Sequence, residues 1–374
     1  MKICLLNIAY YPNVEGGAEV STQKLAEAFA KEHRVYVICT GNTEENQRIN
    51  NVHILHIPAR YTYKNKIDKA INSRYNFHIK ADLVKLLQKI CPDVIHTNNL
   101  HEFTVIVWNI AAALNIPVIH TLRDYTLANP RHWIGKKIVS YSSKNVSIVT
   151  APSNYTLAYF NNMGLFYNAI LSKVVYNAID FDIEELEKLA ELKTNILNKK
   201  HINFAYLGRY SEEKGVNWLI RIFSLFSKNS TLHLFGKGTI DDEVSQHIDN
   251  VKIINHGFLY ENELREYLKN IDVIIAPSKW DEPFGRIVLD AYRSICPVIV
   301  TNRGGLPEIV EDGKTGLIIK ERDDELIFAI NYMECWNNIK LMIPSILRII
   351  KKFEIDYQKE QFINLYRKAL GLKD

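Results

Sequence analysis

Short runs of apolar, mostly β-branched residues alternate with helix-forming segments along this chain, and the alternation limits the fold more than any other feature. In the first half, strand-like runs lie at residues 2–10, 34–40, 52–58, 93–98, 117–122, 147–153 and 173–177, with helical patterns at 18–31, 68–90, 103–114 and 155–163. Short apolar strands separated by helices are typical of parallel sheets that are covered on both faces. The pattern therefore predicts an α/β fold.

The same pattern restarts after a charged segment, residues 182–200, which is expected to be helical. Strand-like runs lie at 202–207, 232–235, 251–255, 273–276, 298–301 and 316–319, helices are expected at 216–226, 243–248, 261–268, 286–294 and 307–311, and the chain is helical after residue 323. At 374 residues, the chain exceeds what a single hydrophobic core usually organises. We expect two Rossmann-like domains, 1–180 and 181–355, that face each other across a ligand-binding cleft.

Composition indicates a soluble globular protein of the cytoplasm. The chain is 47% apolar and 24% charged, and none of its apolar runs approaches the length needed to cross a bilayer. The apolar residues 3–11 are interpreted as a buried strand rather than as the core of a signal peptide, because no small-residue cleavage site follows them. The five cysteines are widely spaced, with no metal-binding pattern, which favours buried thiols in a reducing compartment. We expect no metal and no cofactor.

Positive charge is concentrated in the first half of the chain. Residues 1–180 contain 19 Lys and Arg against 12 Asp and Glu, and residues 60–89 contain eight against two, with Tyr61, Tyr63, Tyr75 and Phe77 among them. Such a segment suits an anionic membrane surface, a groove for an anionic acceptor, or single-stranded nucleic acid. It also suits a solvated helix face. We expect a membrane contact at the inner face of the cell membrane rather than nucleic acid.

In each half of the chain, a glycine-containing loop follows the first strand. Gly16 and Gly17 stand before a helix, where backbone amides can approach an anion. In the second half, Gly208 and Arg209 directly follow a strand, and Lys214 precedes the next helix. Arginine offers a fork for phosphate oxygens and lysine a mobile point charge. The second loop predicts phosphate binding; ordinary tight turns are the alternative for both.

Two further segments of the second half offer oxygen-binding groups. Glu282 lies in a loop and Asp290 in the helix that follows, eight residues later. Their carboxylates can accept hydrogen bonds from sugar hydroxyls, although a helix-start acid and a solvated acid would look the same. Gly304 and Gly305, before a proline at a helix start, are expected to present bare backbone amides, with Glu308 in the first turn.

The acceptor side is expected after a strand of the first half. His120, Arg123, Asp124 and Tyr125 cluster there and would face the cleft, although an Arg123–Asp124 ion pair is an equal alternative. The Asp-x-Asp pattern at 180–182 matches the metal-binding pattern of some sugar transferases. It lies at the domain boundary, away from the strand ends, and we give it no such role.

The order of these motifs resembles that of family 4 retaining glycosyltransferases of the GT-B fold. The resemblance rests on Gly16-Gly17, Gly208-Arg209, Lys214-Gly215, Pro277-Ser278, Glu282-Pro283-Phe284-Gly285, Asp290-Ala291 and Gly304-Gly305-Leu306-Pro307-Glu308, and it spans nearly the whole chain. It implies transfer of a sugar from a UDP or GDP sugar to an acceptor hydroxyl, on a saccharide or lipid-linked saccharide of surface polysaccharide synthesis. It also implies that a last helix, about 356–370, crosses back to the first domain.

The resemblance implies a role for each motif. Arg209 and Lys214 would replace a divalent ion on the leaving diphosphate, and Glu282 would hold the donor sugar. The other donor-binding residues it implies are Gly16, Gly17, Gly208, Gly257, Phe258, Phe284, Gly285, Arg286, Asp290, Gly304, Gly305 and Glu308.

Two positions depart from the family pattern. Asp290 stands where a glutamate usually holds the ribose, and Arg123 stands where many members have histidine. Arginine cannot act as a base at neutral pH. Two rival interpretations therefore stay open: a sugar-nucleotide epimerase or hydrolase on the same fold, and a catalytically inactive subunit that binds nucleotide sugars.

Overall fold

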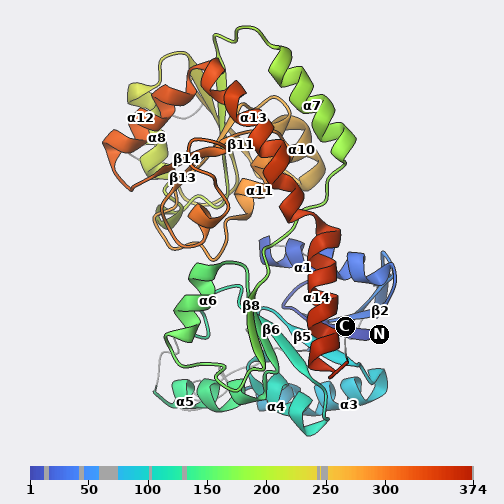
Figure 1. Cartoon of the computed structure of the whole chain (residues 1–374). Coiled ribbons are helices and arrows are strands. Elements are labelled where there is room, and N and C mark those ends of the chain that lie inside the picture. The colour runs from blue at the N-terminus through green and yellow to red at the C-terminus, as the bar shows by residue number, and fades with distance from the viewer. Residues whose placement is uncertain are drawn as a thin grey trace. The chain divides into compact units, whose positions relative to one another are not determined.

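The chain folds into two compact units in a computed structural model that describes residues 1–11, 17–41, 46–58, 75–100, 103–128, 133–241, 245 and 252–372. Unit 1 consists of Met1–Ala178 and Ile355–Asp374, and unit 2 of Ile179–Glu354 (Figure 1). The chain therefore leaves unit 1 at residue 178, where the sequence analysis expects 180, and its last helix returns to unit 1. Within the described residues, no helix is long and apolar enough to cross a membrane.

The described strands of unit 1 form one sheet in the order β3-β4-β2-β1-β5-β6-β7-β8. Their bounds are β1 Lys2–Leu6, β2 Arg34–Gly41, β3 Gln47–Ile49, β4 Val52–Pro58, β5 Val94–Thr97, β6 Val118–Thr121, β7 Ile148–Ala151 and β8 Leu171–Val174. All neighbours pair in parallel except β3, which runs antiparallel to β4. At the centre, Cys4 of β1 pairs with Tyr36 on one side and Ile95 on the other. Every residue of β5, β6 and β7 is buried, as a doubly covered sheet requires.

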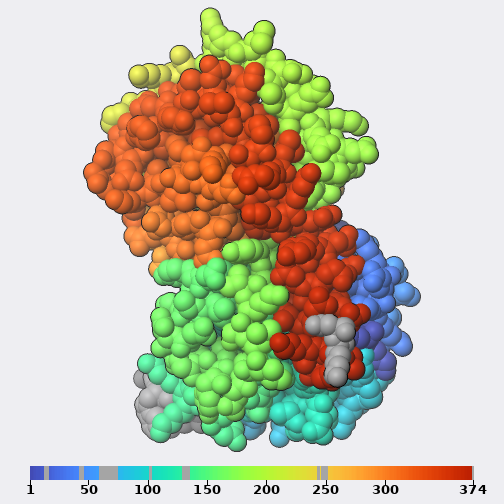
Figure 2. Space-filling model, in the orientation of Figure 1, coloured from blue at the N-terminus to red at the C-terminus, as the bar shows by residue number. Residues whose placement is uncertain are grey.

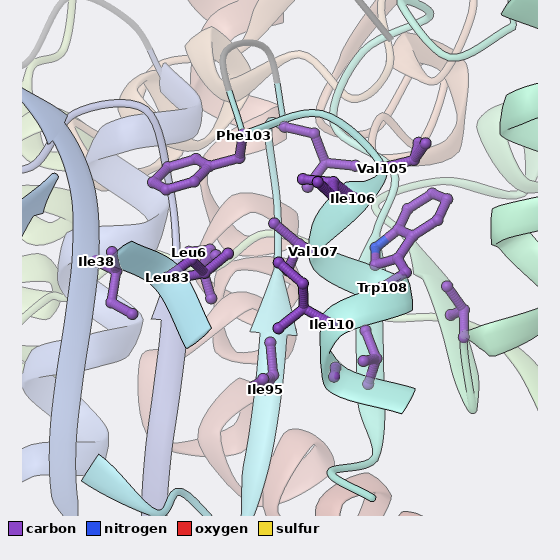
Figure 3. Close-up of a cluster of buried hydrophobic side chains, with 14 of the residues drawn as sticks. Leu6, Ile38, Leu83, Ile95, Phe103, Val105, Ile106, Val107, Trp108 and Ile110 are labelled. Atoms are coloured by element: carbon purple, nitrogen blue, oxygen red, sulfur yellow. The ribbon is translucent and has the colours of Figure 1, made fainter. Parts of the chain in front are cut away.

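Helices cover both faces of this sheet. One face carries α3 (Lys80–Ile90), α4 (Ile106–Ala113), α5 (Trp133–Ser142) and α6 (Asn154–Asn161), and the other carries α1 (Gly17–Ala30) and α14 (Ile355–Ala369). Figure 3 shows Ile95 of β5 close to Val107 and Ile110 of α4, all fully buried or nearly so. Burying each such side chain contributes roughly 1.5–3 kcal/mol.

The C-terminal helix α14 belongs to the core of unit 1. Phe362 and Tyr366 are fully buried, and the Tyr366 hydroxyl lies 2.7 Å from Nδ1 of His96 in β5. Lys359 Nζ donates to Glu32 Oε1 at 2.7 Å. Figure 2 shows the red surface of α14 continuing into the blue surface of the N-terminal segment. The predicted return of the last helix is therefore observed, and it closes one face of the first sheet.

The sheet of unit 2 has the order β11-β10-β9-β12-β13-β14 and is parallel throughout its described strands. The strands are β9 Ile202–Leu207, β10 Ser230–Phe235, β11 Ile253–Gly257, β12 Val273–Ala276, β13 Val298–Thr301 and β14 Gly316–Ile319. The helices are α7 Ile183–Asn195, α8 Val216–Phe226, α10 Glu261–Leu268, α11 Arg286–Arg293, α12 Asp323–Met333 and α13 Trp336–Ile350. The predicted α/β class, with one parallel sheet in each half, is confirmed.

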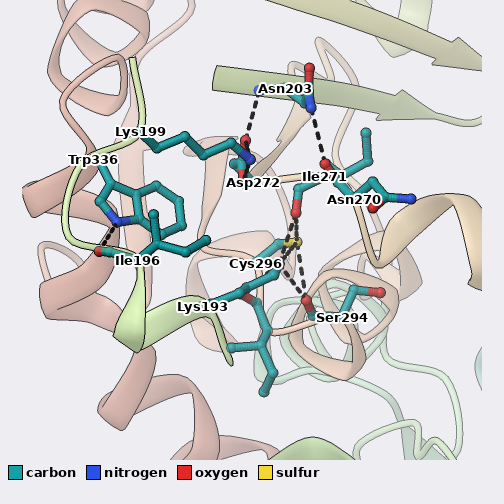
Figure 4. Close-up of polar contacts among 11 residues, drawn as sticks. Lys193, Ile196, Lys199, Asn203, Asn270, Ile271, Asp272, Ser294, Cys296 and Trp336 are labelled. Atoms are coloured by element: carbon teal, nitrogen blue, oxygen red, sulfur yellow. Dashed lines mark hydrogen bonds and ion pairs between the residues drawn. The ribbon is translucent and has the colours of Figure 1, made fainter. Parts of the chain in front are cut away.

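Helix α7 is fixed to unit 2 by a buried lysine. Lys193 Nζ donates to the carbonyl oxygens of Ile271 and Ser294, each at 2.8 Å, and lies 3.3 Å from Cys296 Sγ (Figure 4). At its start, the Asp182 carboxylate accepts hydrogen bonds from the backbone amides of the first turn. Residues 182–200 are thus the first helix of unit 2 and the segment that leads from it to β9.

Some expectations need correction. The cysteines are free, but Cys91 and Cys335 are exposed, because each lies at a helix end rather than inside an apolar run. Helix α5 was not expected, and the predicted helix at 307–311 is a short 3₁₀ turn, η5 (Leu306–Glu308). Of the helix expected at 243–248 the structure describes only residue 245, and the first part of 68–90 lies outside the described residues.

Candidate functional site

The strand order reverses at one point in each sheet. In unit 1, β1 lies between β2 and β5; in unit 2, β9 lies between β10 and β12. Loops that leave two such neighbouring strands diverge, which creates a ligand-binding crevice at the carboxyl ends of the strands. Arg209 and Lys214 follow β9, and Glu282 follows β12. The predicted phosphate- and sugar-binding side chains therefore lie at the switch point of unit 2.

Lys214 and Glu282 form an ion pair there. Lys214 Nζ lies 2.5 Å from Glu282 Oε1, and the two side chains are only 22% and 16% exposed. Because the pair is largely removed from water, salt screens its attraction less than that of surface charges. The ammonium also lies 5.6 Å from the ring centroid of Trp280. One cation and one carboxylate are thus held together beside an aromatic face.

Arg209 lies in the same loop but is exposed. Its NH2 nitrogen lies 3.0 Å from Glu213 Oε1, and the Arg209 side chain is 70% exposed. Ion pairs this exposed are worth little, with a median of about 0–1 kcal/mol, so a phosphate could displace Glu213 at small cost. The backbone at Arg209 is better fixed, because the buried Tyr206 hydroxyl donates to its carbonyl oxygen at 2.6 Å.

Ser278 supports the ion pair, a role that was not predicted although Pro277-Ser278 is one of the motifs that carry the resemblance. Its buried hydroxyl donates to Glu282 Oε1 at 3.0 Å, the same oxygen that Lys214 contacts. The backbone amide of Lys279 donates to the Glu213 carbonyl at 2.9 Å, which joins the loops after β9 and β12. Gly215 allows this approach: its φ is +72°, and a Cβ there would lie 2.0 Å from the Pro277 carbonyl oxygen.

The glycine pair after β13, Gly304 and Gly305, contacts the backbone of Glu282. The Gly305 amide donates to the Glu282 carbonyl at 2.7 Å, so the expectation that both amides of the pair are bare is wrong for Gly305. At Gly304, where φ is +57°, a Cβ would lie 2.2 Å from the Glu282 carbonyl oxygen. Gly304 therefore lets the loop after β13 approach the Glu282 segment closely. Glu308 lies next to them in η5.

Asp290 lies on α11 and is held by a buried arginine. Arg293, only 6% exposed, has NH2 at 3.4 Å from Asp290 Oδ1 and NH1 at 3.2 Å from Glu261 Oε1 and 3.8 Å from Asp180 Oδ1. Asp180 thus joins this ion network and Asp182 caps α7, which gives the Asp-x-Asp pattern a structural explanation. In the described part of the chain, no three His, Cys, Asp or Glu side chains gather as a metal site would need.

The remaining candidate donor residues of unit 2 lie around the same sheet edge. Gly285 precedes α11, with Arg286 as the first helical residue, while the Phe284 side chain is buried and packs 6.3 Å from the ring of Phe353. Phe284 can therefore serve a ligand through its backbone rather than its ring. Gly208 directly follows β9, and its backbone amide donates to the Phe235 carbonyl oxygen at 3.0 Å.

Gly257, the last residue of β11, and Phe258, which follows it, are two of the candidate donor-binding residues. The Gly257 amide donates to Asn255 Oδ1, which also accepts from the Tyr210 hydroxyl at 2.8 Å. Phe258 is 53% exposed, and Lys237 Nζ lies 5.3 Å from its ring centroid. An exposed aromatic face beside a lysine offers a stacking surface at this edge of the sheet.

Unit 1 has its own pocket at the carboxyl ends of β5 and β6. Three expected acceptor residues, His120, Arg123 and Asp124, line it together with Asn98 and Asn99. Arg123 Nε donates to Asn98 Oδ1 at 3.0 Å, and the side chain is 9% exposed. Among the described residues, the buried Asn98 Nδ2 and Asn99 Oδ1 have no hydrogen-bond partner. The two asparagines were missed, although Asn98 ends a predicted strand and Asn99 follows it; their amides suit the hydroxyls of a saccharide.

His120 is buried, whereas Tyr125 is only partly buried. His120 Nδ1 lies 2.9 Å from Thr97 Oγ1, and burial lowers the pKa of His120 to about 3. The imidazole is therefore neutral at pH 7 and a weak base. Tyr125 is not among the pocket-lining residues; its ring packs 4.8 Å from that of Tyr159. Asp124 Oδ1 accepts a hydrogen bond from the Thr126 backbone amide at 2.8 Å.

Two expectations for unit 1 lie partly outside the described residues. Gly16 belongs to the undescribed residues 12–16, and Gly17 is the first residue of α1. Of the basic segment 60–89, the structure describes residues 75–89, which include η1 (Phe77–Ile79) and most of α3.

Comparison with known proteins identifies the class. Residues 15–183 match the family model of Glycosyltransferase Family 4, and residues 188–334 match that of Glycosyl transferases group 1. The two matches together span most of both units, with the first covering the pocket of unit 1 and the second the Lys214–Glu282 pair. The chain belongs to these glycosyltransferases.

Individual relatives cover nearly the whole chain at modest identity. An uncharacterized 42.6 kDa protein in the cps region of Klebsiella pneumoniae is 28% identical and matches 98% of this chain and 100% of its own length. An alpha-maltose-1-phosphate synthase of Mycolicibacterium smegmatis is 23% identical, with 99% and 100% covered. The crystal structure of Anabaena HepE in complex with UDP has a TM-score of 0.74 at 20% identity, with 98% and 100% covered. These solved-structure similarities confirm the GT-B fold.

Proposed function

We propose that this protein transfers a sugar, with retention of configuration, from a nucleoside-diphosphate sugar to an acceptor hydroxyl. The observation that carries the proposal is the Lys214–Glu282 pair at the switch point of unit 2, with Arg209 in the same loop. Lys214 and Arg209 supply positive charge for the leaving diphosphate, and Glu282 supplies a carboxylate for a donor-sugar hydroxyl. HepE of Anabaena is described in complex with UDP-glucose, so UDP-glucose is the first donor to test.

The proposed reaction needs no carboxylate nucleophile. The acceptor hydroxyl attacks the anomeric carbon on the face that the nucleotide leaves, and the departing phosphate oxygen takes its proton. Charge grows on the diphosphate in this oxocarbenium-like step, so catalysis consists of positioning and of stabilising that charge. We propose that Arg209 and Lys214 perform this role without a metal ion.

We further propose that the acceptor is a saccharide or lipid-linked saccharide and that it binds in the pocket of unit 1. Asn98, Asn99, Arg123 and Asp124 offer both donors and acceptors for hydroxyl groups. The relative in a cps region supports a polysaccharide product. The neutral His120 supports binding rather than acid–base chemistry at this position.

The deciding experiment follows the anomeric configuration of the product. The purified protein is incubated with a panel of UDP and GDP sugars and saccharide acceptors, and the new linkage is examined by NMR. Retained configuration at the transferred sugar is expected. An inverted linkage would exclude the mechanism, and release or epimerisation of the sugar without transfer would favour the hydrolase or epimerase alternative.

A further inference from the structure

We propose that unit 1 binds an anionic membrane through a surface made of Tyr141, Lys144, Tyr167 and Ile170, called here the tyrosine–lysine surface. The choice of a membrane as the partner rests on the lipid-linked acceptor in the proposed function. The surface itself rests on exposure, charge and position in unit 1, which are separate from the donor and acceptor groups.

Three large side chains of this surface are exposed to solvent. Tyr141 is 67%, Tyr167 63% and Ile170 64% exposed. Lys144 Nζ lies 5.6 Å from the ring centroid of Tyr141 and 5.6 Å from that of Tyr167. One ammonium therefore lies close to both tyrosine rings, and the exposed Ile170 lies three residues after Tyr167.

The surrounding chain carries charge of one sign. Residues 125–179 contain no Asp or Glu, but they contain Arg131, Lys136, Lys137, Lys144 and Lys173. Lys136 and Lys137 are exposed on α5, the helix that contains Tyr141 in its last turn. Because no carboxylate of this segment offsets these cations, the surface attracts anions over a distance of about a Debye length.

Hydrogen bonds of Asn109 connect the end of α5 with Tyr75, which lies shortly before α3 in the chain. Asn109 Nδ2 donates to Ser142 Oγ and to the Tyr75 hydroxyl, each at 3.1 Å, so Tyr75 lies beside the end of α5. The Tyr75 ring lies 4.8 Å from that of Phe77, which is 55% exposed. The described end of the basic segment 60–89 therefore joins the tyrosine–lysine surface, and Figure 1 shows α3, α4 and α5 along the same face of the sheet.

Tyrosine and lysine side chains suit the boundary between lipid and water. A tyrosine ring can enter the headgroup region while its hydroxyl stays hydrated, and a lysine can extend its charge to lipid phosphates. Tyr141 and Lys144 precede β7, and Tyr167 and Ile170 precede β8, so the surface lies at the amino ends of these strands. The pocket lies at the carboxyl ends of β5 and β6, so a membrane bound here would leave the pocket open.

The test is co-sedimentation of the full chain with vesicles of phosphatidylcholine alone or mixed with phosphatidylglycerol. Wild-type protein should bind the anionic vesicles at low salt and release at high salt, with little binding to neutral vesicles. The Lys144→Ser/Tyr167→Ser variant should lose at least about five-fold in partitioning, the factor that corresponds to ~1 kcal/mol for one lysine near such a surface.

A matched control removes one lysine and one tyrosine elsewhere on unit 1. Tyr357→Ser/Lys368→Ser changes exposed residues of α14 and should bind vesicles as the wild type does. Equal losses in both variants, wild-type binding by the surface variant, or no vesicle binding by the wild type would each overturn the proposal. The proposal would also be overturned if the wild type formed a dimer and bound no vesicles, and if the surface variant disrupted that dimer. Sugar transfer to a soluble acceptor is measured without vesicles, so failure of the proposed function is seen separately.

Discussion

Lys214 Nζ and Glu282 Oε1 are 2.5 Å apart, although 68 residues separate them in the chain. The contact joins the group proposed to bind the leaving diphosphate to the group proposed to bind the donor sugar. Without substrate, each neutralises the other and neither is buried as an isolated charge. Binding of a nucleotide sugar would exchange this ion pair for contacts of each partner with the ligand.

Replacing Lys214 by alanine should lower turnover at least ~100-fold, because the leaving diphosphate loses an electrostatic stabiliser. Steady-state kinetics at saturating donor and acceptor measure this effect. Lys188→Ala, an exposed lysine of α7, serves as the control and should keep wild-type turnover. Near-normal turnover in a folded Lys214→Ala protein would remove the proposed role.

Ser278→Ala should lower kcat by about ten-fold, since a hydrogen bond to a charged group contributes roughly 1.5–3 kcal/mol. Ser278 acts on substrate only through Glu282, so Ser278→Thr should recover part of the loss if its hydroxyl reaches Glu282 Oε1. Ser224→Ala on α8, whose hydroxyl bonds only within its own helix turn, is the matched control. An unchanged kcat in Ser278→Ala would show that the Ser278 hydroxyl is not needed to orient Glu282.

Arg293→Gln should reduce the free energy of unfolding by about 2 kcal/mol, because it leaves Asp290, Glu261 and Asp180 near one another without their shared cation. Urea unfolding measures the change. The exposed Arg221, which pairs with Asp323, provides the comparison, and Arg221→Gln should cost well under 1 kcal/mol. Equal effects of the two substitutions would argue against a special role of the buried network. The same variant should also raise KM for the donor if Arg293 holds Asp290 in place for the ribose.

Stability should fall as pH is lowered below about 6.5, the ordinary pKa of histidine. Burial lowers the pKa of His120 to about 3 in the folded protein. As the pH falls below 6.5, the imidazole is therefore protonated in the unfolded chain but stays neutral in the folded one, which stabilises the unfolded state relative to the folded state. The loss between pH 6.5 and pH 5 is about 2 kcal/mol for this residue. Urea unfolding of His120→Gln should show a shallower dependence over this range. An identical slope in wild type and variant would contradict the assignment.

Sugar transfer should persist in excess EDTA, because the two cations are proposed to take the place of a divalent ion on the diphosphate. The rate is measured with chelator, and then with magnesium restored. Complete loss with EDTA followed by recovery with magnesium would rule out the metal-independent scheme.

The sequence determined the α/β class and the loops that carry the site. The apolar runs of β1, β5, β9 and β12 fix where buried strands form, and in each unit a parallel arrangement brings the carboxyl ends of that unit's own strands to one edge of its sheet. Arg209, Lys214 and Glu282 directly follow such runs, so their place at that edge could be predicted from chain order alone. The return of the last helix was available only from the family resemblance.

Tertiary structure decided which of these groups touch and what state they are in. Ser278 resembles any serine after a strand, and only the packing of the β9 and β12 loops brings it to Glu282. The Gly305 amide donates a hydrogen bond to the Glu282 carbonyl oxygen, and Arg293 forms an ion pair with Asp290. Local pattern specifies secondary structure and edges, because these depend on neighbours along the chain. Contacts and pKa values depend on burial by residues distant in sequence, which no local pattern encodes.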